Sequence, residues 1–325
     1  MEEEYAKKTC VVIASHISNN NRIPYLIDCM YSLLNQSLII HVYLSISFEN
    51  DDIRNEFIEL INSNPYFEKC GMVSIFLREE KTPQMRHMFL LYNYIAERHD
   101  WVMFCDDDDN YTTNRIETFV KNICNGEIQC GKLENKVLAG VYESNFGKDH
   151  REHRHEYWCY CVKMYFLGIF FQKLEKHPDI IDNKCCDVLF AEYLRRLGPN
   201  CLYARVEEKM YNYRVENNSD SITGYIQTKQ RNFTRKSTPP PIGDPAFTDY
   251  VLEFNEHLHE HLGVYIHDTF LRTIVGCDLE YILKAEFRND YEILKFVDEC
   301  HVKQIKEKHD YWRSVCNYLF DIPLN

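Results

Sequence analysis

Residues 101–109 read WVMFCDDDD, so that five apolar residues run directly into four aspartates. A short apolar run without polar alternation is typical of a strand buried on both faces of a sheet. In open α/β sheets, ligands bind beyond the carboxyl ends of the strands. Four carboxylates at such a place repel one another, which favours a bound cation over the alternative of a solvated acidic turn. The sequence therefore predicts a site for Mn²⁺ or Mg²⁺, with Ca²⁺ as an alternative, because all three prefer oxygen ligands.

Segments with strand and helix patterns alternate on both sides of these aspartates. Strand-like apolar runs are expected at residues 9–14, 38–46, 72–77, 101–105, 137–142 and 157–162. Helical periodicity is expected at residues 24–34, 83–98, 114–124, 164–174 and 187–196. This alternation predicts an α/β domain with a mainly parallel sheet flanked by helices.

The C-terminal third of the chain has a different pattern. Residues 217–246 are rich in Ser, Thr, Asn and basic residues and contain three consecutive prolines, which is typical of a linker or a mobile loop. Residues 247–325 have helical periodicity. We therefore expect a catalytic α/β domain at residues 1–216, a linker at 217–246 and a helical C-terminal extension at 247–325.

The charge of the chain limits its partners. Lys and Arg number 37 against 50 for Asp and Glu, which gives a net charge of −13. This charge disfavours a nucleic-acid partner, and it means that the phosphates of a bound nucleotide need a cation beside them. The sequence contains neither G-x-G-x-x-G nor G-x-x-x-x-G-K-[ST], so a dehydrogenase or a P-loop enzyme is disfavoured.

The N-terminus and the cysteines indicate a compartment. Residues 2–4 are all Glu, and no apolar run reaches the roughly 20 residues of a spanning helix. We therefore expect a soluble, cytoplasmic protein without a transmembrane segment. The 14 cysteines are scattered and form no C-x-x-C pair, which predicts free thiols in a reducing compartment.

Four segments within the first 215 residues resemble, in the same order, segments of the GT-A glycosyltransferases, especially family 2. They are the opening VVIASH at residues 11–16 with the chain that follows to residue 36, TPQMRH at 82–87, FCDDDD at 104–109 and DVLFAEYLRRLG at 187–198. The resemblance implies a GT-A-type fold, a nucleotide-sugar donor and a divalent cation. The implied activity is transfer of a hexose or a pentose, with inversion, to a glycan or another hydroxyl acceptor.

The same resemblance implies roles for individual residues. Asp108, helped by Asp106, would bind the metal, and Asp187 would be the general base. The donor-binding side chains would be Ser15, Arg86, Asp106 and Asp107. Tyr157 and Trp158 are candidates for stacking on the acceptor, with burial in the core as the alternative.

Residue chemistry leaves alternatives open at several of these positions. Asp187 could be a helix N-cap, because Asp is favoured there, and Arg86 could be an ordinary surface residue of its helix. The acidic residue that the family usually carries after its second strand falls near Ser45 or Ser47, so the base of the donor stays open. Three histidines are expected in a solvated loop: His150, His153 and His155.

Two other functions share the features of this sequence. A nucleotidyltransferase would use the same α/β layer and carboxylate–metal site but would release pyrophosphate. A catalytically inactive protein could use the acidic pocket only to hold a cation or a nucleotide. Within the glycosyltransferases, a retaining reaction is also open, because it needs the aspartates but no base.

Overall fold

The computed structural model describes residues 2–143, 155–214, 240–279 and 297–320, except for the side chains of residues 68–70. The contacts within the chain divide it into two compact units. The first contains residues 1–214 and the last four residues, and the second contains residues 215–321. Most of the linker expected at residues 217–246 lies outside the described residues.

The first unit is built on a seven-stranded sheet with the order β3-β2-β1-β4-β7-β6-β8. Its strands are β1 (Thr9–Ile17), β2 (His41–Phe48), β3 (Val73–Leu77), β4 (Trp101–Cys105), β6 (Val137–Glu143), β7 (Tyr160–Lys163) and β8 (Cys201–Val206). Strands β3, β2, β1 and β4 are parallel to one another, and β6 is parallel to β8. Strand β7 is antiparallel to both of its neighbours, β4 and β6. The predicted mainly parallel sheet flanked by helices is confirmed.

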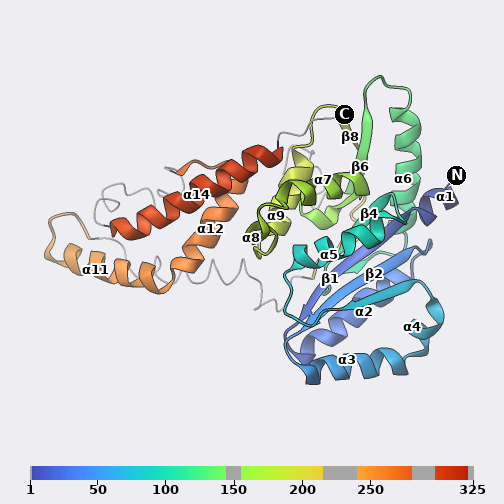
Figure 1. Ribbon diagram of the computed structural model, residues 1–325, viewed down its shortest axis with the longest axis horizontal. Coiled ribbons are helices and arrows are strands. Elements are labelled where there is room, and N and C mark those ends of the chain that lie inside the picture. The colour runs from blue at the N-terminus through green and yellow to red at the C-terminus, as the bar shows by residue number, and fades with distance from the viewer. Residues whose placement is uncertain (1, 144–154, 215–239, 280–296, 321–325) are drawn as a thin grey trace. The chain divides into compact units, whose positions relative to one another are not determined.

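Helices cover both faces of this sheet. They are α1 (Glu2–Lys7), α2 (Ile23–Leu34), α3 (Asp51–Ser63), α4 (Pro65–Cys70), α5 (Gln84–Ala96), α6 (Arg115–Cys130), α7 (Met164–Leu174), α8 (Pro178–Ile181) and α9 (Cys186–Arg195). Figure 1 shows α2 and α3 on one face of β1 and β2, with α5 on the other. The strand order explains why helices lie on both faces. The chain moves in one direction from β1 to β3 and then returns past β1 to β4. Because such crossovers are right-handed, reversing the direction places the connecting helix on the opposite face of the sheet.

The apolar pattern of the sequence explains the core of this unit. Every residue of β4 is buried, and β1 has a single half-buried position. Helix α2 buries the stripe that its 3.6-residue period predicts, including Leu26, Met30 and Leu33. Because β1 and β4 are neighbours and parallel, the segments that follow them emerge at the same edge of the sheet.

The strand expected at residues 157–162 begins later than predicted. Residues Tyr157–Cys159 form a 3-10 turn, and β7 starts only at Tyr160. The amide of Cys159 donates a hydrogen bond to the carbonyl of Glu156 at 3.0 Å, which closes the turn. The turn directs the rings of Tyr157 and Trp158 into the protein instead of along the sheet.

A small second sheet forms beside the aspartates. Strand β5 (Asn110–Tyr111) pairs antiparallel with β9 (Tyr211–Asn212). This pairing brings residues 211–214 next to residues that precede them by about a hundred positions. It is the reason why the end of the first unit contributes to the site described below.

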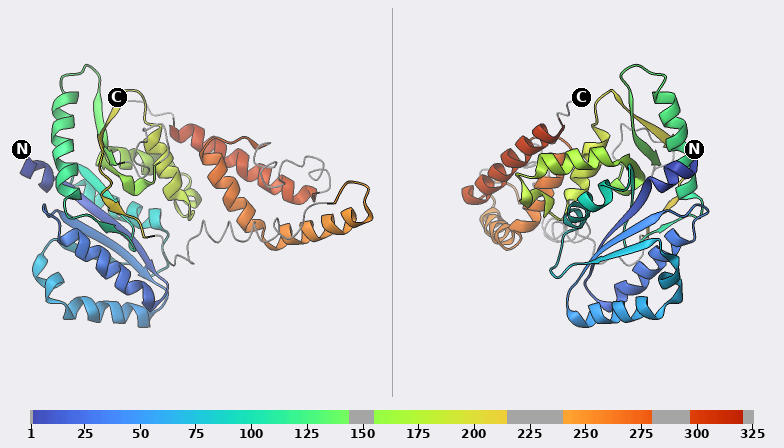
Figure 2. Two further views of the ribbon diagram at one scale, coloured as in Figure 1. Left: turned by 180° about the vertical axis from the view of Figure 1, so that it is seen from behind. Right: turned by 45° about the vertical axis from the view of Figure 1, so that its right-hand side comes forward.

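The second unit confirms the predicted helical C-terminal region. It contains α11 (Pro245–Glu260), α12 (Leu262–Ile274) and α14 (Glu299–Phe320), which Figure 2 shows in two further views. Its core is formed by Phe247, Phe254, Leu258, Tyr265 and Val297. Asp244 caps α11 by accepting a hydrogen bond from the amide of Ala246 at 2.9 Å.

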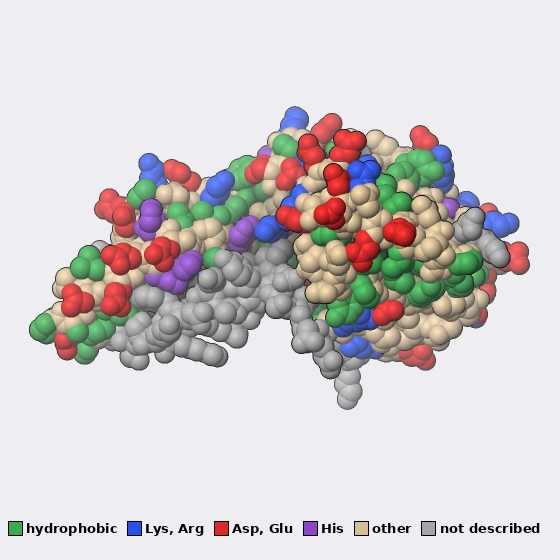
Figure 3. Space-filling view, turned by 90° about the horizontal axis from the view of Figure 1, so that it is seen from below, with side chains coloured by type: hydrophobic (Ala, Val, Ile, Leu, Met, Phe, Trp, Pro, Cys, Tyr) green, Lys and Arg blue, Asp and Glu red, His purple; other side chains and the backbone are tan. Residues whose placement is uncertain are grey.

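Three observations concern the described chain as a whole. Acidic and basic side chains are interspersed on the face seen in Figure 3. The cysteine side chains that the structure describes form no disulfide, as the sequence predicted. No helix among the described residues is both long and apolar enough to cross a membrane.

Candidate functional site

The four aspartates lie where β4 ends, beside the end of β1. Ser15, near the end of β1, donates a hydrogen bond from Oγ to Oδ2 of Asp107 at 2.6 Å. Arg22 follows β1 in a short 3-10 turn, Asn20–Arg22, and its Nη2 lies 2.9 Å from Oδ1 of Asp107. The same nitrogen lies 3.5 Å from Oδ2 of Asp108. The β1 segment therefore supplies both a hydroxyl and a positive charge to the aspartates.

Asp106 is held by three elements. Its Oδ1 accepts hydrogen bonds from Nε2 of Gln84, at 2.9 Å, and from the hydroxyl of Tyr157. Gln84 also donates to the Tyr157 hydroxyl at 2.8 Å. The amide of Asp106 donates to the hydroxyl of Tyr211 at 3.0 Å. Helix α5, the 3-10 turn before β7 and strand β9 thus fix the first aspartate.

Asp109 binds the chain that follows β9. The amide of Arg214 donates to Oδ1 of Asp109 at 2.7 Å. The guanidinium of Arg214 lies 4.7 Å above the ring of Tyr25 and 3.6 Å from the carboxylate of Asp28. Arg22 and Arg214 are therefore the basic groups that the described structure places beside the four aspartates.

Crowding changes the acidity of these carboxyl groups. Burial, followed by the negative charge of Asp109, raises the pKa of Asp106 well above its usual value. Burial and the neighbouring Asp107 raise the pKa of Asp108. Burial likewise raises the pKa of Asp109, to about 7. The ionised forms of these groups are therefore in an unfavourable environment, which a bound cation would improve.

The donor set fits one particular kind of cation site. Among the described residues, no group of three or more His, Cys, Asp or Glu side chains is arranged to hold a metal ion. Mg²⁺ is usually bound by one or two carboxylates, with substrate phosphates and water completing its shell. Asp108 is half-buried, and its Oδ2 lies 3.5 Å from Nη2 of Arg22. The aspartates therefore fit a cation that binds together with a phosphate ligand.

Asp187 lies close to the aspartate loop. It stands in the first turn of α9 and contributes, with the neighbouring aspartates, to the raised pKa of Asp106. Its charge also contributes to the raised pKa of Tyr157, whose main cause is burial. The capping alternative is wrong, because the N-cap of α9 is Cys185 and Asp187 is already inside the helix. Asp187 is half-buried.

Arg86 faces a different partner from the one expected. Its Nε and Nη2 lie 2.7 and 2.9 Å from the two carboxylate oxygens of Asp182, and Nη2 also donates to the carbonyl of Pro178 at 3.2 Å. The guanidinium lies 5.1 Å from the centre of the Phe89 ring. Arg86 therefore ties α5 to the segment around α8, and its contact with a donor stays a prediction.

The two aromatic candidates for acceptor binding are buried. Tyr157 is 2% and Trp158 5% exposed. The indole of Trp158 stacks on Tyr211 with a centroid distance of 3.9 Å and an interplanar angle of 12°. Beyond it, Tyr213 lies 5.8 Å from Trp158 at 14° and is 47% exposed. Tyr213, which the sequence reading did not single out, is therefore the exposed aromatic ring of this stack.

A fully buried ion pair supports the loop from behind. Nε of Arg115 lies 3.3 Å from Oε1 of Glu143, and Nη2 donates to the carbonyl of Trp158 at 2.8 Å. The Arg115 guanidinium also lies 4.0 Å from the centre of the Tyr111 ring. Oε2 of Glu143 accepts from the amide of Met210 at 2.7 Å. This ion pair joins α6, β6 and the residue just before β9. No local pattern in the sequence predicts it.

A buried histidine occupies the region where the sequence reading left the donor base open. Nδ1 of His87 lies 2.8 Å from Oγ of Ser45, and its Nε2 lies 3.3 Å from Oγ of Ser47. Burial, followed by the charges of Arg78 and His16, lowers the pKa of His87 to about 3. At neutral pH His87 is therefore an uncharged bridge between the two serines.

The histidine loop is only partly described. Residues 150 and 153 lie outside the described residues. His155 is buried, with its ring centroid 5.2 Å from that of Tyr142. The expectation of a solvated position is therefore wrong for His155, because the aromatic residues of β6 and β7 enclose its ring.

Comparison with known proteins finds matches among solved structures. No protein-family model matches the chain, and no curated protein matches it. Two solved structures of S. aureus TarS match with TM-scores of 0.42, at 11% and 12% identity. Each covers 95% of this chain, which spans 55% of the longer TarS chain and 90% of the TarS 1–349 chain.

A third match is the mannosyltransferase PcManGT from Pyrobaculum calidifontis in complex with GDP-Man and Mn²⁺. It has a TM-score of 0.46 and 11% identity, and covers 97% of this chain and 85% of its own. The strand order, the antiparallel β7 and the aspartates after β4 define an α/β fold of the GT-A type, as the sequence predicted.

Proposed function

We propose that this protein is a glycosyltransferase that uses a divalent cation, Mn²⁺ or Mg²⁺, to bind a nucleotide-sugar donor. The sugar, a hexose or a pentose, is transferred with inversion to a hydroxyl group of a glycan or another acceptor. One observation carries the proposal: four aspartates stand at the carboxyl end of β4, with Arg22 beside them. The pKa values of Asp106, Asp108 and Asp109 are raised, and the charge of Asp187 is near enough to contribute to the shift at Asp106.

Donor binding follows from the chemistry of this loop. Asp108, with help from Asp106, would hold the cation, which when bound would neutralise charge on the diphosphate leaving group. Ser15 and Arg22 fix Asp107, so the loop keeps its shape before the donor arrives. Arg22 adds a second positive charge near the same phosphates, which stabilises the charge that develops as the diphosphate leaves.

Proton transfer is assigned to Asp187. A general base must be a carboxylate or similar group within reach of the acceptor hydroxyl. Asp187 accepts the hydroxyl proton while the oxygen attacks the anomeric carbon from the face opposite the diphosphate. The bond from that carbon to the diphosphate oxygen breaks with its electron pair on the oxygen, and the configuration is inverted.

The test is a donor screen with and without metal. The full chain is incubated with UDP-, GDP- and dTDP-sugars, including GDP-mannose, in MnCl₂ or in EDTA, and the release of nucleoside diphosphate is measured. Release in MnCl₂ that is lost in EDTA and in Asp108→Asn supports the proposal. Asp249→Asn is the matched control, because Asp249 is exposed in the second unit. A parallel incubation with a nucleoside triphosphate and a sugar 1-phosphate tests the alternative, because release of pyrophosphate there would identify a nucleotidyltransferase.

A further inference from the structure

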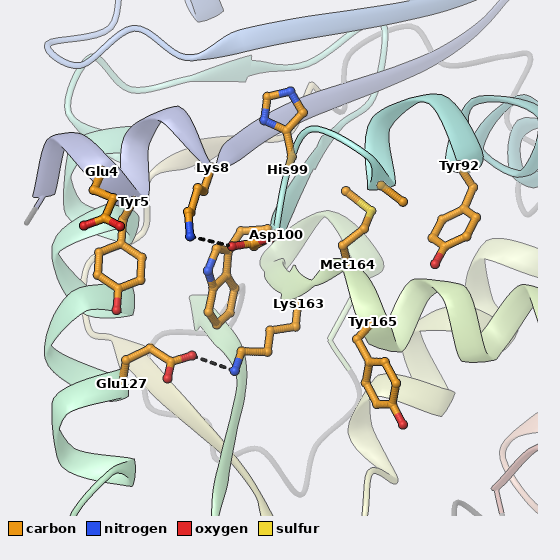
Figure 4. A pocket seen from close by; sticks show the side chains of 12 residues that line it. Glu4, Tyr5, Lys8, Tyr92, His99, Asp100, Glu127, Lys163, Met164 and Tyr165 are labelled. Atoms are coloured by element: carbon orange, nitrogen blue, oxygen red, sulfur yellow. Dashed lines mark ion pairs between the residues drawn. The ribbon is translucent and has the colours of Figure 1, made fainter. Parts of the chain in front are cut away.

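A cavity of about 570 Å³ lies at the end of the sheet opposite the aspartates. Trp101, the first residue of β4, lines it, whereas Asp106 follows the last residue of that strand. At roughly 3.3 Å per residue, the two sites are about 17 Å apart along β4. The cavity lies wholly within the first unit, and Figure 4 shows its side chains coming from α1, α5, α6 and the junction of β7 with α7.

Two ion pairs cross the walls of this cavity. Nζ of Lys8 lies 3.2 Å from Oδ2 of Asp100, and Nζ of Lys163 lies 2.7 Å from Oε1 of Glu127, as the dashed lines of Figure 4 show. The Lys163 ammonium also lies 5.3 Å from the centre of the Trp101 ring. Lys163 and Glu127 come from β7 and α6. Lys8 and Asp100 lie side by side, because they immediately precede the neighbouring parallel strands β1 and β4.

Aromatic side chains line the rest of the cavity. Tyr5 comes from α1, Tyr92 from α5 and Tyr165 from the first turn of α7. The Tyr92 hydroxyl fits against Gly168, where a Cβ atom would come within 2.0 Å of it. Tyr165 is 54% exposed, so its ring is accessible to a ligand.

The balance of charges selects the class of ligand. The cavity carries two lysines and three carboxylates, the third being Glu4. An anion would face the excess carboxylate, and a cation would compete with lysines that are already paired. A neutral polyhydroxyl ligand can accept hydrogen bonds from the ammonium groups and donate them to the carboxylates without leaving a charge unpaired. Its C–H faces can also pack on the tyrosine rings.

We infer that this cavity is a saccharide-binding site separate from the aspartate site. Lys163 and Glu127 bind sugar hydroxyls from one wall, Lys8 and Asp100 bind them from another, and Tyr165 covers the open side. The chemistry of the cavity itself selects the ligand, so the inference is independent of the proposed transferase function.

Saturation-transfer difference NMR on the full chain tests the inference. The probes are the methyl glycosides of glucose, galactose, mannose and N-acetylglucosamine, in EDTA and without nucleotide. At least one glycoside should bind. Lys163→Met and Tyr165→Ala should each weaken that binding, the first by about tenfold or more, because it removes a hydrogen bond to a charged group.

Matched controls lie outside the cavity. Lys121→Met breaks the exposed Lys121–Glu117 pair, and Tyr318→Ala removes a tyrosine that is 56% exposed, so both should leave binding unchanged. Circular dichroism and Tm show that each variant is folded. The inference is overturned if no glycoside binds, if Lys163→Met binds as tightly as the native chain, or if inorganic phosphate competes for the site.

The outcome can be separated from that of the proposed function. Glycoside binding is measured in EDTA, where metal-dependent transfer is absent, and nucleoside diphosphate release is measured on Lys163→Met and the native chain alike. Release without glycoside binding at this cavity would refute the saccharide site alone. Glycoside binding lost in Lys163→Met, in a chain that releases no nucleoside diphosphate from any donor, would refute the transferase alone.

Discussion

Oγ of Ser15 lies 2.6 Å from Oδ2 of Asp107, although 92 positions separate the two residues in the sequence. The contact exists because β1 and β4 are parallel neighbours, with Ile13 opposite Cys105. The segments that follow the two strands therefore leave the sheet together. Asp107 is buried, so its carboxyl oxygens depend on the hydrogen bonds from Ser15 and Arg22, and these bonds hold the aspartate loop in place.

We expect Ser15→Ala to weaken donor binding and to destabilise the fold. The variant removes a hydrogen bond to a buried carboxylate, which costs about 1–3 kcal/mol in free energy of unfolding. Urea unfolding gives the stability, and calorimetric titration of a nucleoside diphosphate with MnCl₂ gives the affinity. Ser63→Ala, which removes an exposed hydroxyl bonded to a backbone carbonyl, should change neither quantity. Native-like affinity in Ser15→Ala would show that the loop does not depend on this contact.

Tyr157→Phe distinguishes two functions of Tyr157. The variant keeps the ring, which an acceptor would need for stacking, and removes the hydroxyl that binds Asp106. The ring is 2% exposed and is therefore not accessible to an acceptor. The lost hydrogen bond to the Asp106 carboxyl should lower donor affinity about tenfold. The KM of the acceptor should not change. Tyr66→Phe, which loses a hydroxyl contact with Asn35 outside the site, is the control. A change confined to the acceptor KM would contradict the assignment.

The sequence predicts the parts of this site that depend on local pattern and on parallel strands. A buried apolar run followed by aspartates is visible within nine residues, and parallel neighbours place Ser15 beside them. The turn at Tyr157–Cys159 is invisible, because alternating aromatics fit a strand equally well. Arg22 stood within a resembling segment, but its pairing with Asp107 depends on the fold of the loop after β1.

Contacts that depend on how several elements are arranged in the fold are the hardest to predict from the sequence. The Arg115–Glu143 pair and the stacking of Trp158 on Tyr211 join elements whose side-by-side placement depends on the order β4-β7-β6 and on the β5–β9 pairing. The partner of Arg86 is similar, because Asp182 lies 96 positions away and just after α8. Helix periodicity indicates which face of α5 is apolar, but it does not predict which carboxylate forms an ion pair with Arg86.

We expect the stability of the protein to fall as the pH decreases below about 6.5, in part because of His87. The side chain is 1% exposed, and burial lowers its folded-state pKa to about 3, whereas an unfolded histidine has a pKa of about 6.5. Between these values only the unfolded chain binds the proton, so protonation favours unfolding by up to about 1.4 kcal/mol per pH unit. The full contribution is present above the unfolded pKa.

His87→Gln tests this pH dependence. Glutamine keeps hydrogen-bonding groups near Ser45 and Ser47 but does not titrate. Urea unfolding at pH 6.5 and pH 5 should show a loss in the native chain that exceeds the loss in the variant by about 1.6 kcal/mol. His41→Gln, a partly buried histidine bonded to Ser74, is the control and should retain most of the pH dependence. Equal losses in the native chain and in His87→Gln would assign the effect to other groups.

Asp187→Asn is the decisive variant for the proposed mechanism. Asp187 lies in the first turn of α9, near enough to Asp106 to help raise the pKa of that carboxyl. Asparagine has the same size and cannot accept the acceptor's proton, so we expect turnover to fall by roughly a hundredfold or more. Donor binding in MnCl₂ should survive, because the carboxylates of the metal site are intact. Asp108→Ala should do the reverse and remove donor binding together with activity.

Asp51→Asn changes an exposed aspartate in the first turn of α3, and it controls for the loss of a charge at the start of a helix. The anomeric configuration of the product, read by NMR, completes the test. Near-native turnover in Asp187→Asn, or a product that keeps the configuration of the donor, would remove Asp187 from the reaction and indicate a retaining enzyme.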